Sequence, residues 1–239
     1  MSRPIANLFI APALVVGFAA AAQAAPFFQA ASSGSRSASV LFDTSGTDLI
    51  VTLTNTSALD ALVPVDVLGA VFFDVAGSPL TLTRASAVVP AGHVVFNGPT
   101  DPGNVVGGEW AYNSGLSGAP FSAAYGISSV GLGLFGPGDL FPGTDLQPPT
   151  SPDGLQYGIT TAGDNPLTGN TPMMTNALIR NQVVFTLSGL PLGFDPSTMI
   201  SNITFQYGTD LAEPQIRVPA PGALLLAPVG GLLALRRRR

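Results

Sequence analysis

The chain has 239 residues, with 14 acidic and nine basic side chains, no cysteine and a single histidine. Without cysteine it can form neither disulfides nor thiolate metal sites, and one histidine cannot supply a cluster of zinc ligands. The acidic surplus repels phosphate backbones and therefore argues against binding to DNA or RNA.

Residues 1–24 have the organisation of a secretory signal peptide. An arginine near the start is followed by an apolar run, and Ala22 and Ala24 are small residues at the spacing that signal peptidase requires. We therefore expect export through the secretion translocon, cleavage by signal peptidase, and a mature chain that begins at Ala25.

Residues 25–36 are rich in Ala and Ser, and we expect them to form a linker ahead of a folded domain at 37–217. The first two strands of that domain are predicted at 40–43 and 49–55, because both runs are apolar and β-branched and the turn-forming residues 44–47 lie between them. In the second run, apolar and polar residues alternate, so one face should be buried.

Further strands are predicted at 67–75, 80–89, 181–187 and 200–207. Between them, residues 92–169 are rich in Gly, Pro, Asn and Asp and favour long surface connections over helices. Some eight to ten short strands separated by turns indicate an all-β fold, an antiparallel β-sandwich with long Gly/Pro-rich loops.

The C-terminus has three parts: a proline motif, an uncharged apolar stretch and four arginines. They are, in order, Val218, Pro219, Ala220 and Pro221; residues 222–235; and Arg236, Arg237, Arg238 and Arg239. As a helix at about 1.5 Å per residue, the segment from 218 to 235 would reach roughly 27 Å, close to the hydrocarbon thickness of a bilayer. We expect a transmembrane helix here, with the arginines in the cytoplasm and residues 25–217 on the outside.

This order of proline motif, apolar segment and arginine cluster resembles the PEP-CTERM sorting signal of bacterial surface proteins that exosortase processes. The family's usual Glu between the two prolines is Ala220 here. Residues 53–57, 66–68 and 70–74 are also similar to a segment of exosortase-dependent surface proteins. The resemblance implies retention at the inner membrane of a Gram-negative, polysaccharide-producing host until exosortase cuts near the prolines. The mature domain is then expected on the cell surface or in the extracellular matrix, where polysaccharide is a possible partner.

Few side chains suggest catalysis. His93 lies beside a glycine, and the sequence lacks the Gly-Xaa-Ser-Xaa-Gly motif of a serine nucleophile that a histidine could activate. The chain also has no lysine for a Ser-Lys pair. Glycoside hydrolysis would need paired carboxylates, and Glu109, with Trp110 and Tyr112 beside it, is the most suggestive acid. A buried tryptophan accounts for that grouping better, so we assign no catalytic residue and do not expect an enzyme.

Four loop acids, Asp139, Asp145, Asp153 and Asp164, carry the hard oxygen ligands that Ca²⁺ prefers. Their spacing lacks the regular pattern of a calcium loop, and turn capping explains them equally well. No cofactor or metal site is assigned. The expected function is that of a structural or interaction protein, and the alternatives are a secreted glycan-binding module or a polysaccharide hydrolase.

Overall fold

The computed structural model describes residues 24–77 and 79–220. Within them lie 13 strands, two short α-helices and five 3₁₀ turns. The strands are β1 (Phe27–Ser33), β2 (Arg36–Ser45), β3 (Asp48–Asn55), β4 (Leu68–Val75), β5 (Thr83–Val88), β6 (Val95–Phe96), β7 (Ala111–Ser114), β8 (Tyr125–Ser128), β9 (Ile159–Thr160), β10 (Leu178–Arg180), β11 (Gln182–Ser188), β12 (Ile200–Tyr207) and β13 (Gln215–Arg217). The helices are α1 (Thr171–Thr175) and α2 (Pro196–Met199), and the 3₁₀ turns are η1 (Pro64–Asp66), η2 (Gly107–Glu109), η3 (Pro120–Ser122), η4 (Pro137–Asp139) and η5 (Pro166–Thr168).

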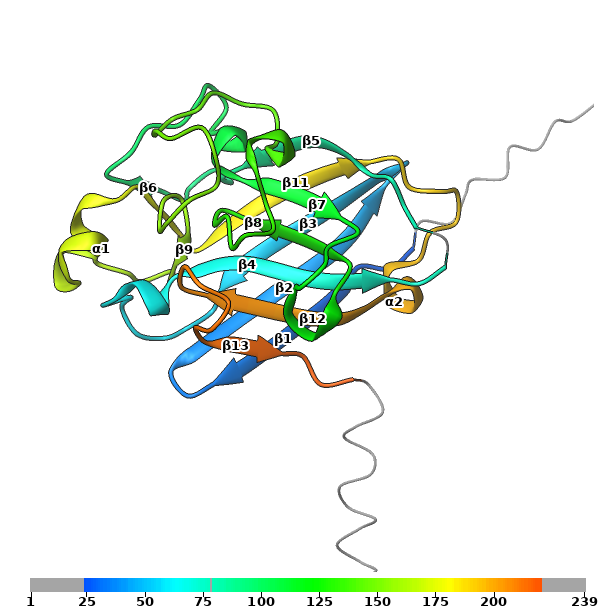
Figure 1. Ribbon diagram of the computed structural model, residues 1–239, viewed down its shortest axis with the longest axis horizontal. Helices are drawn as coiled ribbons and strands as arrows, with labels where there is room; N and C mark the ends of the chain where they lie inside the picture. Colours follow the sequence, from blue (N-terminus) through cyan, green and yellow to red (C-terminus); the bar gives the residue numbers. More distant parts are fainter. Residues whose placement is uncertain (1–23, 78, 221–239) are drawn as a thin grey trace, which may run out of the picture.

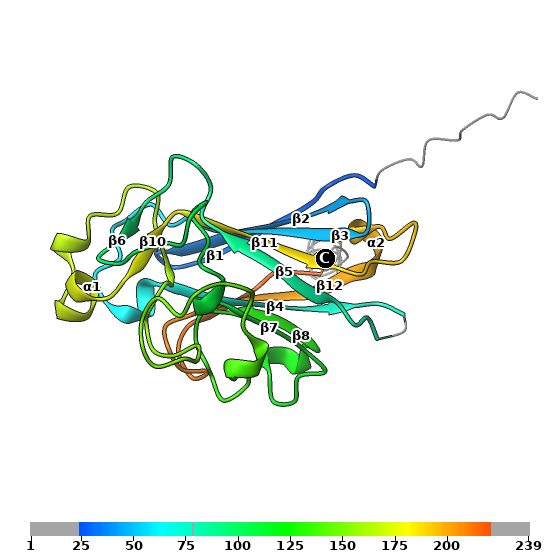
Figure 2. The same ribbon diagram turned by 90° about the horizontal axis from the view of Figure 1, so that it is seen from above.

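The strands form two sheets, which confirms the all-β prediction. The first sheet has the order β1-β2-β3-β11-β5, and all its pairs are antiparallel. The second has the order β13-β12-β4-β9-β10-β6, with β8 and then β7 added beside β4. Only β9 and β10 pair in parallel. The two sheets lie face to face in a sandwich-like arrangement (Figures 1 and 2).

The predicted first hairpin is confirmed. Strands β2 and β3 pair from Ala38 opposite Asn55 to Ser45 opposite Asp48, and a two-residue turn joins them. Leu49, Val51 and Leu53 are fully buried while the residues between them are partly exposed, so the alternation in the sequence does mark the core face.

The expected linker at 25–36 is wrong. Residues 27–33 form β1, which pairs with β2 from Phe27 opposite Phe42 to Ser33 opposite Arg36. Alanine and serine have little intrinsic preference for strands, but the adjoining strand β2 supplies hydrogen-bond partners, and Phe27 stacks on Phe42 with ring centroids 6.4 Å apart. The folded domain therefore begins about ten residues earlier than composition suggests.

The second sheet is covered on both faces, because part of the 92–169 region folds over its outer side. Phe135 from this region packs on Phe72 of β4 with ring centroids 6.2 Å apart. Gly126 makes room for both rings, since a Cβ atom there would lie 2.8 Å from Phe72 and 2.9 Å from Phe135. Burial on both faces explains why β4 is a continuous apolar run. The expectation of purely surface connections is thus only partly right.

The expected membrane segment falls largely outside the described residues. Among residues 24–77 and 79–220, no helix is long and apolar enough to cross a membrane. The described part of the segment, Val218 to Ala220, is not helical and continues from β13. Its first residue is held by a backbone hydrogen bond to β12, and proline at the next position removes a helix donor.

Candidate functional site

The two ends of the described chain lie together beside α2. One cavity flanking this helix is lined by Ala24 and Asp195, and another by Thr198 and Ala220. In Figure 1 the blue start and the orange end of the chain lie on the α2 side of the domain, away from α1. We call this end the terminal pole. It carries the predicted signal-peptidase position and the beginning of the predicted sorting motif.

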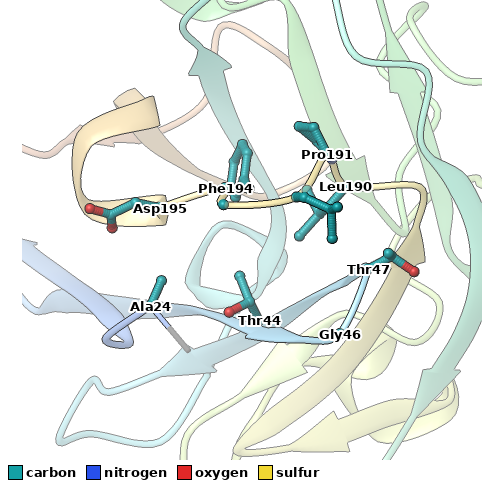
Figure 3. Close-up of a pocket in the computed structure, with 10 residues that line it drawn as sticks. Ala24, Thr44, Gly46, Thr47, Leu190, Pro191, Phe194 and Asp195 are labelled. Carbon is teal, nitrogen blue, oxygen red and sulfur yellow. The ribbon is translucent and has the colours of Figure 1, made fainter. Parts of the chain in front are cut away.

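The first cavity, of about 500 Å³, lies next to Ala24. One wall is the turn between β2 and β3, with Gly46 and Thr47, and the other is the loop 190–195 (Figure 3). The loop is fixed to the turn because the N–H groups of Gly189 and Leu190 donate to the Thr47 carbonyl at 3.0 and 2.8 Å. Ala24 is partly exposed and Ala25 is exposed, whereas Ala22 lies outside the described residues.

The second cavity, of about 450 Å³, lies between β1 and the ends of β12 and β13. Val218, on its wall, is only 9% exposed, and its N–H donates to the Ile203 carbonyl at 2.9 Å. Pro219 and Ala220 are exposed. The first residue of the proline motif is therefore the last residue that the sheet holds. Its second proline and the arginine cluster lie outside the described residues.

The residue before Val218 is also anchored. The Arg217 guanidinium donates to the side-chain oxygen of Asn202 at 2.9 Å and lies 4.6 Å above the centre of the Phe121 ring. Such cation–π contacts stabilise exposed arginines by about 0.5–1 kcal/mol. The chain is thus fixed to the second sheet up to the edge of the proline motif.

Asp195 caps the helix between the two cavities. Its carboxylate accepts hydrogen bonds from the Ser197 N–H at 2.9 Å and from the Ser197 hydroxyl at 2.8 Å, and these bonds lower the pKa of Asp195. Among the described residues that line the first cavity, it is the only ionisable side chain. Because its carboxylate is committed to the helix cap, that cavity offers no free acid or base.

Glu109, Trp110 and Tyr112 are buried, with 5%, 0% and 2% exposure. The carboxylate of Glu109 accepts hydrogen bonds from the N–H groups of Leu146 and Gln147 at 2.7 and 3.0 Å, and burial raises its pKa. The glutamate therefore holds a loop in place. The indole and the phenol are core side chains that cannot stack on a sugar.

The four loop acids have separate roles. Asp139, Asp145 and Asp164 accept hydrogen bonds from the Gly136 N–H, the Thr150 hydroxyl and the Ala61 N–H, each at 2.8 Å. For the remaining acid, Asp153, burial and the nearby Asp145 charge raise the pKa. Within the part of the chain that the structure describes, no three His, Cys, Asp or Glu side chains converge as metal ligands.

The single histidine is a neighbour of β10 and β11. The His93 ring nitrogen Nδ1 lies 3.3 Å from the side-chain nitrogen of Asn181, and this is the one side-chain hydrogen bond found for it within the described ranges. No serine or acid shares that hydrogen bond, so the histidine lacks the partners of a hydrolytic triad.

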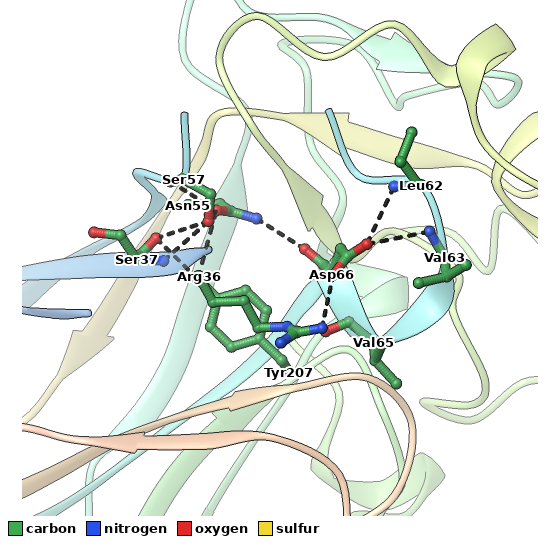
Figure 4. A network of polar contacts seen from close by, with 9 residues as sticks. All are labelled: Arg36, Ser37, Asn55, Ser57, Leu62, Val63, Val65, Asp66 and Tyr207. Atoms are coloured by element: carbon green, nitrogen blue, oxygen red, sulfur yellow. Dashed lines mark hydrogen bonds and ion pairs between the residues drawn. The ribbon is translucent and has the colours of Figure 1, made fainter. Parts of the chain in front are cut away.

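A polar network joins the two sheets near the start of β2 (Figure 4). At its centre, the fully buried Asn55 donates from its side-chain nitrogen to the carbonyls of Ile159 and Asp66 at 2.9 and 3.3 Å. Its side-chain oxygen accepts from the Ser57 hydroxyl at 2.7 Å and from the Tyr207 hydroxyl at 3.5 Å. One amide thus connects β3, β9, β12 and the loop before β4.

An ion pair extends this network to the surface. The Arg36 guanidinium donates to the Asp66 carboxylate at 2.7 Å and to the Val65 carbonyl at 2.6 Å. The second carboxylate oxygen of Asp66 accepts from the N–H groups of Leu62 and Val63 at 3.2 and 3.3 Å. Asn55 and Asp66 thus serve the packing of the two sheets.

Sequence reasoning missed three features: β1, the α2 cap and the inter-sheet network. The cap had a usable signal, because Asp195, Pro196 and Ser197 have the order of an N-cap residue followed by proline at the first helical position. The network had none, since Asn55 lies more than 100 residues from Ile159 and Tyr207, its partners in the second sheet.

Fold and site together define an all-β, two-sheet domain, and the two ends of the described chain both lie beside α2. Comparison with protein-family models, with curated proteins and with solved structures found no match to this chain.

Proposed function

We propose that this chain is an exported structural or interaction protein of the cell surface or extracellular matrix. In this proposal a C-terminal sorting signal retains it at the inner membrane, and exosortase then cuts near the proline motif. The secretion translocon, signal peptidase and exosortase are its partners during export. We also propose that the two sheets form an antiparallel β-sandwich and that a membrane-spanning helix follows the domain.

The observation that carries the proposal is where the folded domain stops relative to the two predicted processing points. All the buried core residues of the described chain lie between Ala38 and Val218. Ala25, at the start, and Pro219 and Ala220, at the end, are exposed. Cleavage before Ala25 and again among the prolines would therefore remove no core residue. A protein that must survive two cuts needs this arrangement.

The anchoring of Val218 narrows the position of the second cut. A protease binds its substrate as an extended chain, and residues up to Val218 are engaged in pairing with β12. A cut upstream of Val218 would first require β13 to separate from the sheet. We therefore place the cut between Pro219 and Pro221.

The test is the intact mass of the protein isolated from its native host, beside an exosortase-deficient strain. We expect a chain that starts at Ala25 and ends between Pro219 and Pro221, and a retained tail in the deficient strain. A tail through Arg239 in both strains would show that the protein is not processed and would overturn the proposal.

A variant pair tests the role of the missing carboxylate. Ala220→Glu restores the residue that is usual in the family and should accelerate processing. Ala85→Glu adds the same charge at an exposed position of β5 and should leave processing unchanged. Equal processing in both variants and the original chain would show that this position is not recognised.

A further inference from the structure

Strand β1 is an open edge of the first sheet. Within the described residues it pairs only with β2, so its other side presents unpaired backbone N–H and C=O groups. It is seven residues long, and its register with β2 is continuous from Phe27 to Ser33. The strand contains no charged residue and no proline. Such an edge is a template on which another strand can pair. Proteins normally prevent this pairing with charges, prolines, bulges or very short strands.

The opposite edge of the same sheet, β5, is protected in several of these ways. It carries Arg84, and its register with β11 shifts between Thr186 and Leu187. A neighbouring loop also covers its end, because the N–H of Val106 donates to the Ala87 carbonyl at 3.0 Å.

The outer strands of the second sheet are short. Strand β13 has three residues and includes Arg217, and prolines lie within two residues of it on both sides. Strand β6 has two residues. Strand β7, the outer strand beside β8, has four residues, and Ala111 at its start is bridged to Leu140. Among the described residues, the other outer strands are thus short, charged or interrupted, and β1 is left open.

We propose that β1 is an interface for a second copy of this chain, whose own β1 pairs with it antiparallel across a two-fold axis. The first sheet then continues from one copy into the other. A two-fold axis uses the same surface on both copies, as most soluble homodimers do.

Charge favours this occupant at this place. Residues 25–217 hold four arginines and 14 acidic residues, a net charge of −10, so two copies repel each other over most of their surfaces. All seven residues of β1 are uncharged, and pairing β1 with itself brings no like charges into register.

The side chains of β1 also suit self-pairing. Phe28, Ala30 and Ser32 are exposed on one face, and the Phe28 ring is 60% exposed. With the two-fold axis at Ala30, each Phe28 lies opposite Ser32 of the second copy. The small side chains at 30 and 32 leave room for the two rings, which then lose exposed apolar surface.

The absence of cysteine makes a direct test possible in the full-length chain. Ala30→Cys places the introduced thiols of two copies opposite each other, so mild oxidation should give a covalent dimer on a non-reducing gel. Ala85→Cys, at an exposed alanine at the centre of the protected edge β5, is the matched control and should give no covalent dimer on the gel. Equal cross-linking of both variants would overturn the proposal.

A second pair of variants addresses the dimer itself, measured by light scattering on the full chain in detergent and on the form isolated from the host. The original chain and Ala85→Lys should be dimeric, and Ala30→Lys should be monomeric because it sets two like charges opposite each other. Circular dichroism should show all three folded, since both alanines are exposed. A monomeric original chain, or a dimer that Ala30→Lys leaves intact, refutes the interface.

Discussion

Replacing Asn55 with alanine should destabilise the domain more than any other single change in the inter-sheet network. The side chain is fully buried. It donates hydrogen bonds to Ile159 and Asp66, and it accepts three, two from Ser57 and one from Tyr207. The bonds to Ile159 and Ser57, at 2.9 and 2.7 Å, have the best geometry. Ser57 and Tyr207 keep a second acceptor, the Ser37 carbonyl, so the main penalty falls on the carbonyl of Ile159.

The magnitude follows from those contacts. Two good hydrogen bonds contribute about 1 kcal/mol each, and a buried carbonyl left without its partner costs a further 1–3 kcal/mol, so Asn55→Ala should lose about 3–5 kcal/mol. For a domain of this size that corresponds to a fall in Tm of roughly 6–20 °C. Chemical denaturation followed by circular dichroism measures the loss of free energy, and thermal denaturation measures the fall in Tm.

A nearby residue provides the control. Thr56 is exposed and shares one hydrogen bond with the Ser37 hydroxyl, so Thr56→Ala should change stability by less than about 0.5 kcal/mol. Asn55→Asp keeps the side-chain shape but sets an oxygen against the two carbonyls, and it should be at least as destabilising as alanine at neutral pH. If Asn55→Ala falls within the range of the Thr56 control, the amide does not hold the sheets together and the reasoning fails.

Two further predictions concern the region that covers the second sheet. Burial raises the pKa of Glu109, so the folded state holds the proton to higher pH than the unfolded chain and loses stability as the pH rises from the unfolded pKa through the folded one. Glu109→Gln retains an oxygen for the two N–H donors, so this variant should be at least as stable as the original chain at pH 7, and the difference should shrink below about pH 4. Glu213→Gln, at a partly exposed acid, is the control. A Glu109→Gln variant that is less stable than the original chain at pH 7 would contradict the assignment. Gly107→Ala puts a Cβ atom against the Pro142 carbonyl oxygen and should lower the free energy of unfolding by more than about 2 kcal/mol, measured by thermal or denaturant unfolding. Gly138→Ala, whose Cβ would have no atom within 4 Å, is the control and should be nearly neutral. Equal effects would show that the backbone adjusts freely at Gly107.

The part of the fold that the sequence predicts is the part governed by local patterns. Strands β2, β3, β4, β11 and β12 all carry runs of β-branched or aromatic residues bounded by turns, and the structure has them within a few residues of the expected positions. Strand β1 lacks such a run, because its stability comes from pairing with β2 and from the contact of Phe27 with Phe42.

Long-range packing is the part that local patterns could not reveal. Phe135 packs on Phe72 and Trp110 packs on Phe185, with ring centroids 6.2 and 4.9 Å apart, although both pairs are more than 60 residues apart in the chain. A glycine-rich sequence without periodicity gives no indication of these contacts. At the terminal pole, the sequence predicts two processing points, while the anchoring of Val218 required the structure.

The position of both ends of the described chain at the terminal pole has a consequence for orientation. In our proposal, the domain is attached during export first through its N-terminal segment and then through its C-terminal one. Because Ala24 and Ala220 both lie beside α2, this change of attachment does not require the domain to turn over. In either state α1, which includes the exposed Met174, lies away from the attached end.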